Sequence, residues 1–318
     1  VIIPAIYSFL QQDYPRELYD IIVISDQMQE STNEALRQLP VRLLIADYTD
    51  SSKAKAMSLA MNATADIPYD AVVIMDADNT AGTSFLSELN PVFQSGARAV
   101  QAHRTAKNTN TDIAVLDAAS EEINNSIFRS GHIALGLSSA LIGSGMALEA
   151  CWFRQHIHLL ETAGEDKEME ALLLKQRIHI EYLEHVYVKD EKTQKKEGIK
   201  NQRKRWIAAQ FDSLVRTLPD FPKELLRGNI DYCDKVFQWT LLPRIILIFC
   251  TFFFTILVTL VSPYSSIKWW ILAFALFLAL FTAIPGHLLN KQLLRAIFQL
   301  PSLLLGIASN LFKLKGVN

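Results

Sequence analysis

The sequence is poor in cysteine and has almost no charge imbalance. Only three cysteines, Cys151, Cys233 and Cys250, occur among its 318 residues, and they lie far apart. This spacing excludes a zinc-binding motif and a disulfide framework, so we expect reduced thiols in a cytoplasmic setting. The formal net charge is −2 and no basic tract is interleaved with aromatic residues, which argues against a nucleic-acid partner.

Apolar residues are unevenly distributed. Half of all residues are hydrophobic, yet residues 1–218 have the mixed composition of a soluble domain, whereas the chain from Arg244 onward has that of a membrane protein. The expected organisation is a soluble domain (1–218), an amphipathic connector (219–243), a transmembrane hairpin (244–290) and an interfacial amphipathic helix (291–318).

Two segments of the hairpin, 244–262 and 269–289, are long enough to cross a bilayer as helices. The basic residues Arg244, Lys291 and Arg295 flank its outer ends, which favours a cytoplasmic location for the soluble domain. The alternative is a buried helical hairpin of a soluble protein, and two apolar segments of this length argue against it.

The first part of the soluble domain alternates between expected strands and helices. Apolar, partly β-branched runs predict strands at 1–4, 20–25, 41–46 and 71–75, and capping residues predict helices at 31–39 and 51–60. This order is typical of an α/β fold with a parallel sheet covered on both faces. Because the carboxyl ends of parallel strands share one edge, we expect a nucleotide site there, lined by Asp26, Asp47, Asp76 and Asp78.

Asp76-Ala77-Asp78 is the centre of this expected site. Two carboxylates separated by one small residue, directly after a buried strand, suit Mg²⁺ or Mn²⁺, which in turn neutralises phosphate oxygens. The alternative is a solvated turn that contains two aspartates.

Three later stretches also carry possible chemistry. Gly143-Ser144-Gly145 allows close backbone approach by a ligand, or is a routine tight turn; no Gly-Lys-Ser/Thr follows, so it is not a phosphate loop. Gly164-Glu165-Asp166 opens an expected helix, where acidic residues also complement the helix dipole. Gln202-Arg203-Lys204-Arg205-Trp206 could hold a diphosphate and stack on a ring, or be a solvated helix start.

Residues 111–128 are expected to be helical, with Glu121 and Glu122 on the face opposite the apolar residues.

Together these motifs resemble the membrane-bound, processive-type branch of glycosyltransferase family 2, which contains cellulose, chitin and hyaluronan synthases. Asp26 is similar to the family's aspartate that contacts uridine, and Asp76-Ala77-Asp78 matches its Asp-x-Asp. Glu165-Asp166 matches its Glu-Asp, with Gly164 where threonine is common, and residues 202–206 match Gln-x-x-Arg-Trp.

The resemblance implies a GT-A fold and a role for each motif. It implies Asp166 as the catalytic base and Asp78, with Asp76, as ligands of Mg²⁺ or Mn²⁺. Donor-binding residues would be Asp26, Lys53, Asp76, Gln202, Arg203 and Arg205. Acceptor-binding residues would be Glu165, Trp206, Gly143, Ser144 and Gly145.

The implied activity is inverting transfer from a nucleoside diphosphate sugar, with UDP as the expected nucleotide, to a glycan at the cytoplasmic face of a membrane, which in a bacterium is the inner membrane. Two spans are few for a polymer-conducting channel, so a lipid-linked acceptor stays open. A third reading is a non-catalytic subunit that binds nucleotide sugar or glycan within a synthase complex, with partner subunits or as an oligomer.

Overall fold

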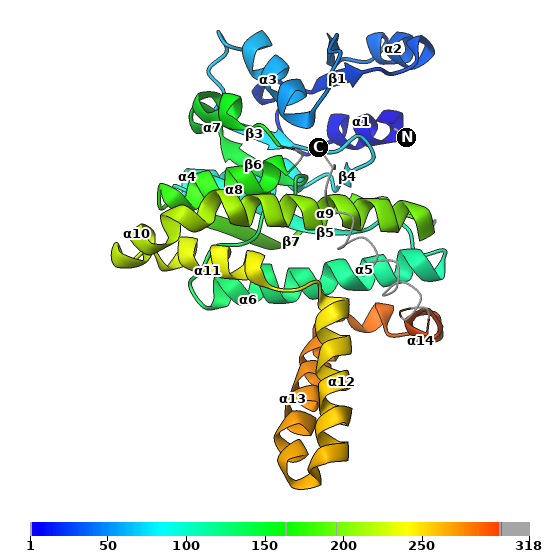
Figure 1. Cartoon of the computed structure of the whole chain (residues 1–318). Helices are drawn as coiled ribbons and strands as arrows, with labels where there is room; N and C mark the ends of the chain where they lie inside the picture. Colours follow the sequence, from blue (N-terminus) through cyan, green and yellow to red (C-terminus); the bar gives the residue numbers. More distant parts are fainter. Residues whose placement is uncertain (1, 163, 195, 299, 301–318) are drawn as a thin grey trace.

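The computed structural model describes residues 2–162, 164–194, 196–298 and 300. In Figure 1 an α/β body lies above a long helical hairpin, drawn in yellow and orange, that projects away from it.

The N-terminal layer contains a two-stranded parallel sheet, in which β1 (Ile22–Asp26) pairs with β2 (Arg42–Ala46). It is flanked by α1 (Ile2–Leu10), α2 (Glu30–Arg37) and α3 (Lys53–Ala63). The strand expected at 1–4 is wrong, since residues from Ile2 onward are helical and Val1 lies outside the described residues. In α1, Ile6 is buried with Val23 and Leu36, and Pro4 is in the first turn, where a missing N–H removes no helical hydrogen bond.

The main sheet has five strands in the order β3-β6-β5-β7-β4. Their bounds are β3 (Ala71–Ile74), β4 (Thr80–Ala81), β5 (Ala99–Ala106), β6 (Met146–Glu149) and β7 (Ile180–Asp190). Within this sheet the neighbours β5 and β7 pair in parallel, whereas β6 pairs antiparallel with β3 and β5, and β4 pairs antiparallel with β7. The prediction of a purely parallel sheet is therefore wrong, because β6 separates β3 from β5.

Both faces of the main sheet are covered, which explains the continuous apolar runs of its strands. On one face Met146 and Leu148 of β6 pack with residues of α3, of α7 (Ala150–His156) and of α8 (Glu165–Lys175). On the other face Ala147 packs with Phe85 and Leu89 of α4 (Phe85–Gln94). Residues 146, 147 and 148 thus point alternately to the two faces of the sheet, as successive side chains of a β-strand do.

Further helices lie in front of the sheet or below it in Figure 1. They are α5 (Asp112–Asn124), which continues as a π-helix (Asn125–Ser130) into α6 (Gly131–Ala134), then α9 (Lys196–Thr217), α10 (Phe221–Leu226) and α11 (Ile230–Thr240). Short 3-10 turns occupy Arg16–Leu18, Ile157–Leu159, Leu218–Asp220 and Gly286–Leu288. Helix α11 is fixed to the body by Lys235, whose ammonium group lies 2.8 Å from the buried carboxylate of Glu170.

The projecting hairpin consists of α12 (Arg244–Val261) and α13 (Pro263–Thr282). By length and composition both could cross a membrane, with mean hydropathies of 2.5 and 1.7, and only 11% of either window is buried in the protein. The second helix starts and ends earlier than the predicted 269–289, because Ser262 caps a helix that begins at Pro263. Helix α14 (Lys291–Ile297) packs Leu293 and Ala296 against α5, and the rest of the predicted interfacial helix, 301–318, lies outside the described residues.

Candidate active site

Two turns from distant parts of the chain are bonded to each other at the end of β3. One is Asp76-Ala77-Asp78-Asn79, closed by a hydrogen bond from the Asn79 N–H to the Asp76 carbonyl (3.1 Å). The other contains Ser144, whose hydroxyl accepts from the Asp76 N–H (3.2 Å) and donates to the Asn79 side-chain oxygen. Ser144 and Asn79 are both fully buried, so these bonds fix the position of the two turns relative to each other.

Gly143 brings the expected site residues together. Its carbonyl accepts a hydrogen bond of 2.7 Å from the Lys53 ammonium group, which also donates to the carboxylate of Asp76. A Cβ atom at position 143 would lie 3.7 Å from the Lys53 Nζ, 3.8 Å from Asp166 Oδ2 and 3.8 Å from Glu165 Oε1. The residues from α3, β3, the Gly143 turn and α8 therefore face one small space.

The positive φ of Gly143 (77°) gives glycine a conformational advantage there. Gly145 also has a positive φ (64°), and a Cβ on it would approach Val188 to 3.2 Å. Gly145 is thus buried against β7, and Ser144 supports the turn that carries Asp76 through its hydroxyl, whereas Gly143 adjoins Lys53, Glu165 and Asp166.

The two acidic residues at the start of α8 differ in environment. Burial, with a further contribution from Asp166, raises the pKa of Glu165, while Lys53, whose ammonium group is 3.9 Å away, acts in the opposite direction. Asp166 accepts a hydrogen bond from the Lys167 N–H (2.9 Å) through Oδ1, and its Oδ2 is the atom near Gly143. Asp166 thus offers one carboxylate oxygen to the shared space.

Asp78 has the features of a cation ligand. Burial raises the pKa of Asp78, and the negative charges of Asp190 and Asp76 raise it further, so a divalent cation would relieve an excess of negative charge. The described residues contain no group of three or more histidine, cysteine or acidic residues that could hold a metal by themselves. Two carboxylates fit Mg²⁺ or Mn²⁺, which is commonly bound by one or two carboxylates together with substrate phosphates.

Asp26 ends β1 on the separate two-stranded sheet. One of its carboxylate oxygens accepts from the Ser51 hydroxyl, and the other, Oδ1, is buried without a hydrogen-bond partner among the described residues. An N–H donor of a ligand could satisfy that oxygen. Asp47 follows β2 and is exposed.

The segment Gln202–Trp206 is divided between two faces of α9. Arg205 and Trp206 are exposed, and 42% of the Trp206 surface is accessible. Gln202 Oε1 and Arg203 Nε are buried without hydrogen-bond partners among the described residues. Burial lowers the pKa of Arg203, and the charge that opposes this effect is Asp117 on α5. The diphosphate-binding role expected for Gln202, Arg203 and Arg205 stays a prediction.

A buried ionic cluster that the sequence does not predict lies next to Asp76 and Asp78. Glu121, expected on a polar helix face, is 6% exposed and pairs with Arg104 (2.9 Å) and Lys192 (3.3 Å). Although burial alone would raise the pKa of Glu121, these two cations and Arg129 hold it well below its usual range. The adjacent residues Glu121 and Glu122 could have predicted this cluster only if the positions of Arg104 and Lys192 opposite them had been known.

The chain is similar to known proteins over most of its length. The family model described as "Glycosyltransferase like family 2" matches residues 1–209. No curated protein is similar. Residues 1–349 of S. aureus TarS, solved in complex with UDP-GlcNAc, are 12% identical, with a TM-score of 0.46 over 97% of this chain and 85% of that one.

A glucosyl-3-phosphoglycerate synthase from Mycobacterium tuberculosis, solved with Mn²⁺, UDP-glucose and phosphoglyceric acid, is 16% identical. Its TM-score is 0.44 over 66% of this chain and 74% of that one. Since the family model covers well over half of the chain, including every motif up to Trp206, the protein belongs to glycosyltransferase-like family 2.

Proposed function

We propose that this glycosyltransferase moves a sugar, with inversion, from a UDP-sugar to a hydroxyl group of a glycan acceptor at a membrane surface. The observation that carries the proposal is the convergence of Lys53, Glu165 and Asp166 on Gly143, with Lys53 also bonded to Asp76. This arrangement supports the proposal because transfer from a diphosphate uses a carboxylate base close to groups that stabilise the negative charge of the leaving diphosphate.

Asp166 would act as the base. Its Oδ2 would accept the proton of the acceptor hydroxyl while the hydroxyl oxygen attacks the anomeric carbon from the side opposite the diphosphate. The bond between the anomeric carbon and the diphosphate oxygen then breaks, and UDP leaves with the bonding electrons. Nearby Glu165 would accept a hydrogen bond from the acceptor, and exposed Trp206 would offer an aromatic face to a sugar ring.

The donor would be held from both sheets. Asp26 Oδ1 would accept an N–H of the uracil base, and Lys53 and Arg205 would donate to the diphosphate. Asp78, with Asp76, would hold Mg²⁺ or Mn²⁺, which when bound neutralises charge on the leaving diphosphate. The side chains of Gln202 and Arg203 would have to leave their buried positions on α9 to reach the diphosphate, whereas the side chain of Arg205 is already exposed.

A membrane location is supported by α12 and α13, which are apolar and have only 11% of either window buried in the protein. An integral membrane protein with its catalytic domain in the cytoplasm, in a bacterial inner membrane, is the corresponding proposal. Two such helices, the exposed residues Leu294 and Ile297 of α14 and the exposed Phe298 that follows it also favour the alternative of a lipid-linked acceptor.

The deciding experiment uses the detergent-purified full chain with Mn²⁺ or Mg²⁺ and a panel of UDP- and GDP-sugars, and measures both nucleotide release and products. Metal-dependent UDP release with one donor supports the proposal, and a ladder of products would show processive addition. Glycan and lipid acceptors are added separately, so the acceptor that gives product identifies the class. Nucleotide binding without release from any donor would contradict catalysis and favour a non-catalytic subunit of a complex.

A further inference from the structure

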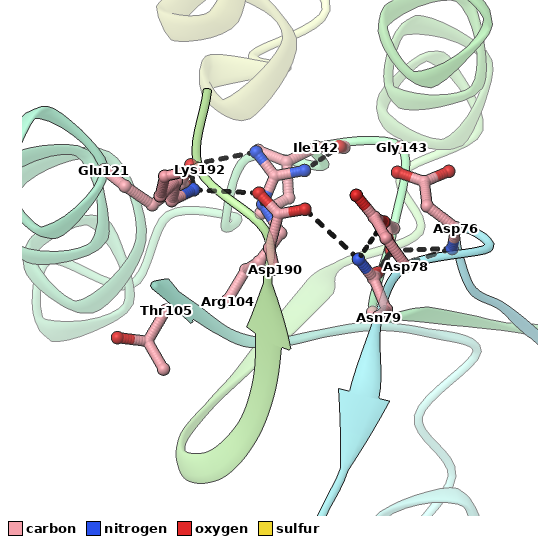
Figure 2. Close-up of polar contacts among 12 residues, drawn as sticks. Asp76, Asp78, Asn79, Arg104, Thr105, Glu121, Ile142, Gly143, Asp190 and Lys192 are labelled. Atoms are coloured by element: carbon pink, nitrogen blue, oxygen red, sulfur yellow. Dashed lines mark hydrogen bonds and ion pairs between the residues drawn. The ribbon is translucent and has the colours of Figure 1, made fainter. Parts of the chain in front are cut away.

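Asp190, the last residue of β7, accepts a hydrogen bond from Asn79, which belongs to the Asp76–Asn79 turn. The Asn79 side-chain amide donates to Asp78 Oδ1 (3.0 Å) and to Asp190 Oδ1 (3.2 Å), as Figure 2 shows. Asn79 is fully buried, and its own oxygen accepts from the Ser144 hydroxyl. With both ends of the amide engaged, the direction of its N–H groups is fixed.

Asp190 is itself held from the protein interior. Its Oδ2 accepts from the Lys192 ammonium group (2.9 Å) and lies 3.9 Å from Arg104 Nε, and both cations also pair with Glu121. The backbone of Lys192 is bonded in both directions to the Asn108 side chain, at 2.7 and 3.2 Å. In Figure 2 Asp190 lies between this cationic group and Asn79.

We propose that Asp190 is a positioning residue for the cation site: it orients Asn79, which in turn holds one oxygen of Asp78 and leaves the other to face the metal and the diphosphate. This inference rests on the proposed function. Lys192 and Arg104 offset part of the charge of Asp190, and the role proposed here for Asp190 is that of a hydrogen-bond acceptor for Asn79. Residues of this kind behind a metal ligand commonly change metal affinity by tenfold to a hundredfold when removed.

The test measures Mn²⁺ binding to the full-length protein in detergent with saturating UDP, using the electron paramagnetic resonance signal of free Mn²⁺. Asp190→Ala should weaken binding by about tenfold or more. Asp190→Asn keeps an oxygen that can accept from Asn79, so its Mn²⁺ affinity should stay within about twofold of wild type. Glu191→Ala is the matched control, because exposed Glu191 contributes negative charge at Asp78 without touching Asn79.

A second variant removes any dependence on the folding of Asp190→Ala. Asn79→Asp is nearly isosteric and replaces the donating amide by a negative charge. If charge alone controlled the site, Mn²⁺ would bind more tightly; loss of the oriented donor predicts weaker binding. Thermal unfolding of each variant establishes that the compared proteins are folded.

The outcomes separate the two ideas. If wild type binds Mn²⁺ and Asp190→Ala binds it equally well, the positioning role is wrong and the proposed function stands. If Asp190→Asn is as weak as Asp190→Ala, the charge of Asp190 holds the metal and the positioning role is again wrong. If wild type with UDP binds no Mn²⁺, the metal-dependent function fails, and the positioning role fails with it.

Discussion

Gly164 and Ala209 approach each other so closely that a side chain at position 164 has no room. A Cβ atom on Gly164 would lie 2.8 Å from the Cβ of Ala209. Gly164 precedes α8, which begins with Glu165 and the proposed base Asp166, and Ala209 lies in α9, which carries Arg205 and Trp206. The contact therefore allows the proposed base and the proposed acceptor-binding helix to lie close together.

The first prediction concerns this contact. Gly164→Ala should destabilise the protein by about 1–3 kcal/mol, since a methyl group would be forced into filled space. Adding Ala209→Gly should recover much of the loss, with a favourable coupling energy of about 0.5–3 kcal/mol between the two changes. Chemical denaturation of both single variants and the double variant measures the coupling. Gly82→Ala is the control, because nothing lies near a Cβ at position 82; additive effects at 164 and 209 would contradict the prediction.

Asp166→Asn should abolish transfer while nucleotide binding stays within about twofold of wild type. The amide keeps the shape of the carboxylate but cannot take the acceptor proton, and loss of a general base commonly costs about 10²–10⁴ in rate. Transfer assays and calorimetric titration with UDP check the two halves of the prediction. Asp66→Asn, at an exposed aspartate, is the matched control. Turnover close to wild type would show that Asp166 is not the base.

Lys53→Met should have opposite effects on two ligands. Without Lys53, Asp76 and Glu165 lose the cation that now faces them, so Mn²⁺ should bind more tightly in the absence of nucleotide. UDP should bind more weakly, because the diphosphate loses a charged donor whose hydrogen bonds contribute about 1.5–3 kcal/mol. Binding of each ligand alone is measured by titration. Lys55→Met, two residues further on α3 and exposed, serves for comparison; equal changes in both variants would rule out a local role for Lys53.

Glu165 should make the donor-free protein less stable as the pH rises. A raised pKa means that the folded state holds the Glu165 proton more tightly than the unfolded chain does. The free energy of unfolding contributed by this group is therefore greatest below about pH 4 and falls as the pH rises through the raised folded pKa. Glu165→Gln should flatten the dependence in that range and raise the melting temperature at pH 7. Melting curves at several pH values test this, and a Gln variant that is less stable at pH 7 would contradict it.

Much of the site could be predicted from local sequence patterns. The strand before Asp76, the cap before Lys53 and the helix starting at Glu165 follow from apolar periodicity and end signals within a few residues. What those patterns could not provide is pairing between distant segments. The start of the helix at Ile2–Leu10 resembles a strand at 1–4 because its first apolar residues are adjacent, and only packing on β1 selects the helix there.

Local sequence patterns also could not predict the burial of Glu121 or the hydrogen bonds of Asn79, because both depend on distant segments of the chain. A helical wheel places Glu121 opposite the apolar residues of α5, yet both sides of α5 are covered, one by α14 and one by Arg104 and Lys192. Asn79 resembles any turn residue until the fold places Ser144 and Asp190 beside it. Long-range contacts, not propensities, created these features.

The separation of the sheet into two parts gives the donor a structural task. Asp26 ends a strand of the two-stranded sheet, whereas Asp76 follows a strand of the five-stranded sheet. A nucleotide that contacts both aspartates would join the sheets as a non-covalent cross-link. Its binding would then add to the unfolding free energy in proportion to the logarithm of its concentration, and the N-terminal layer would gain the most protection from hydrogen exchange.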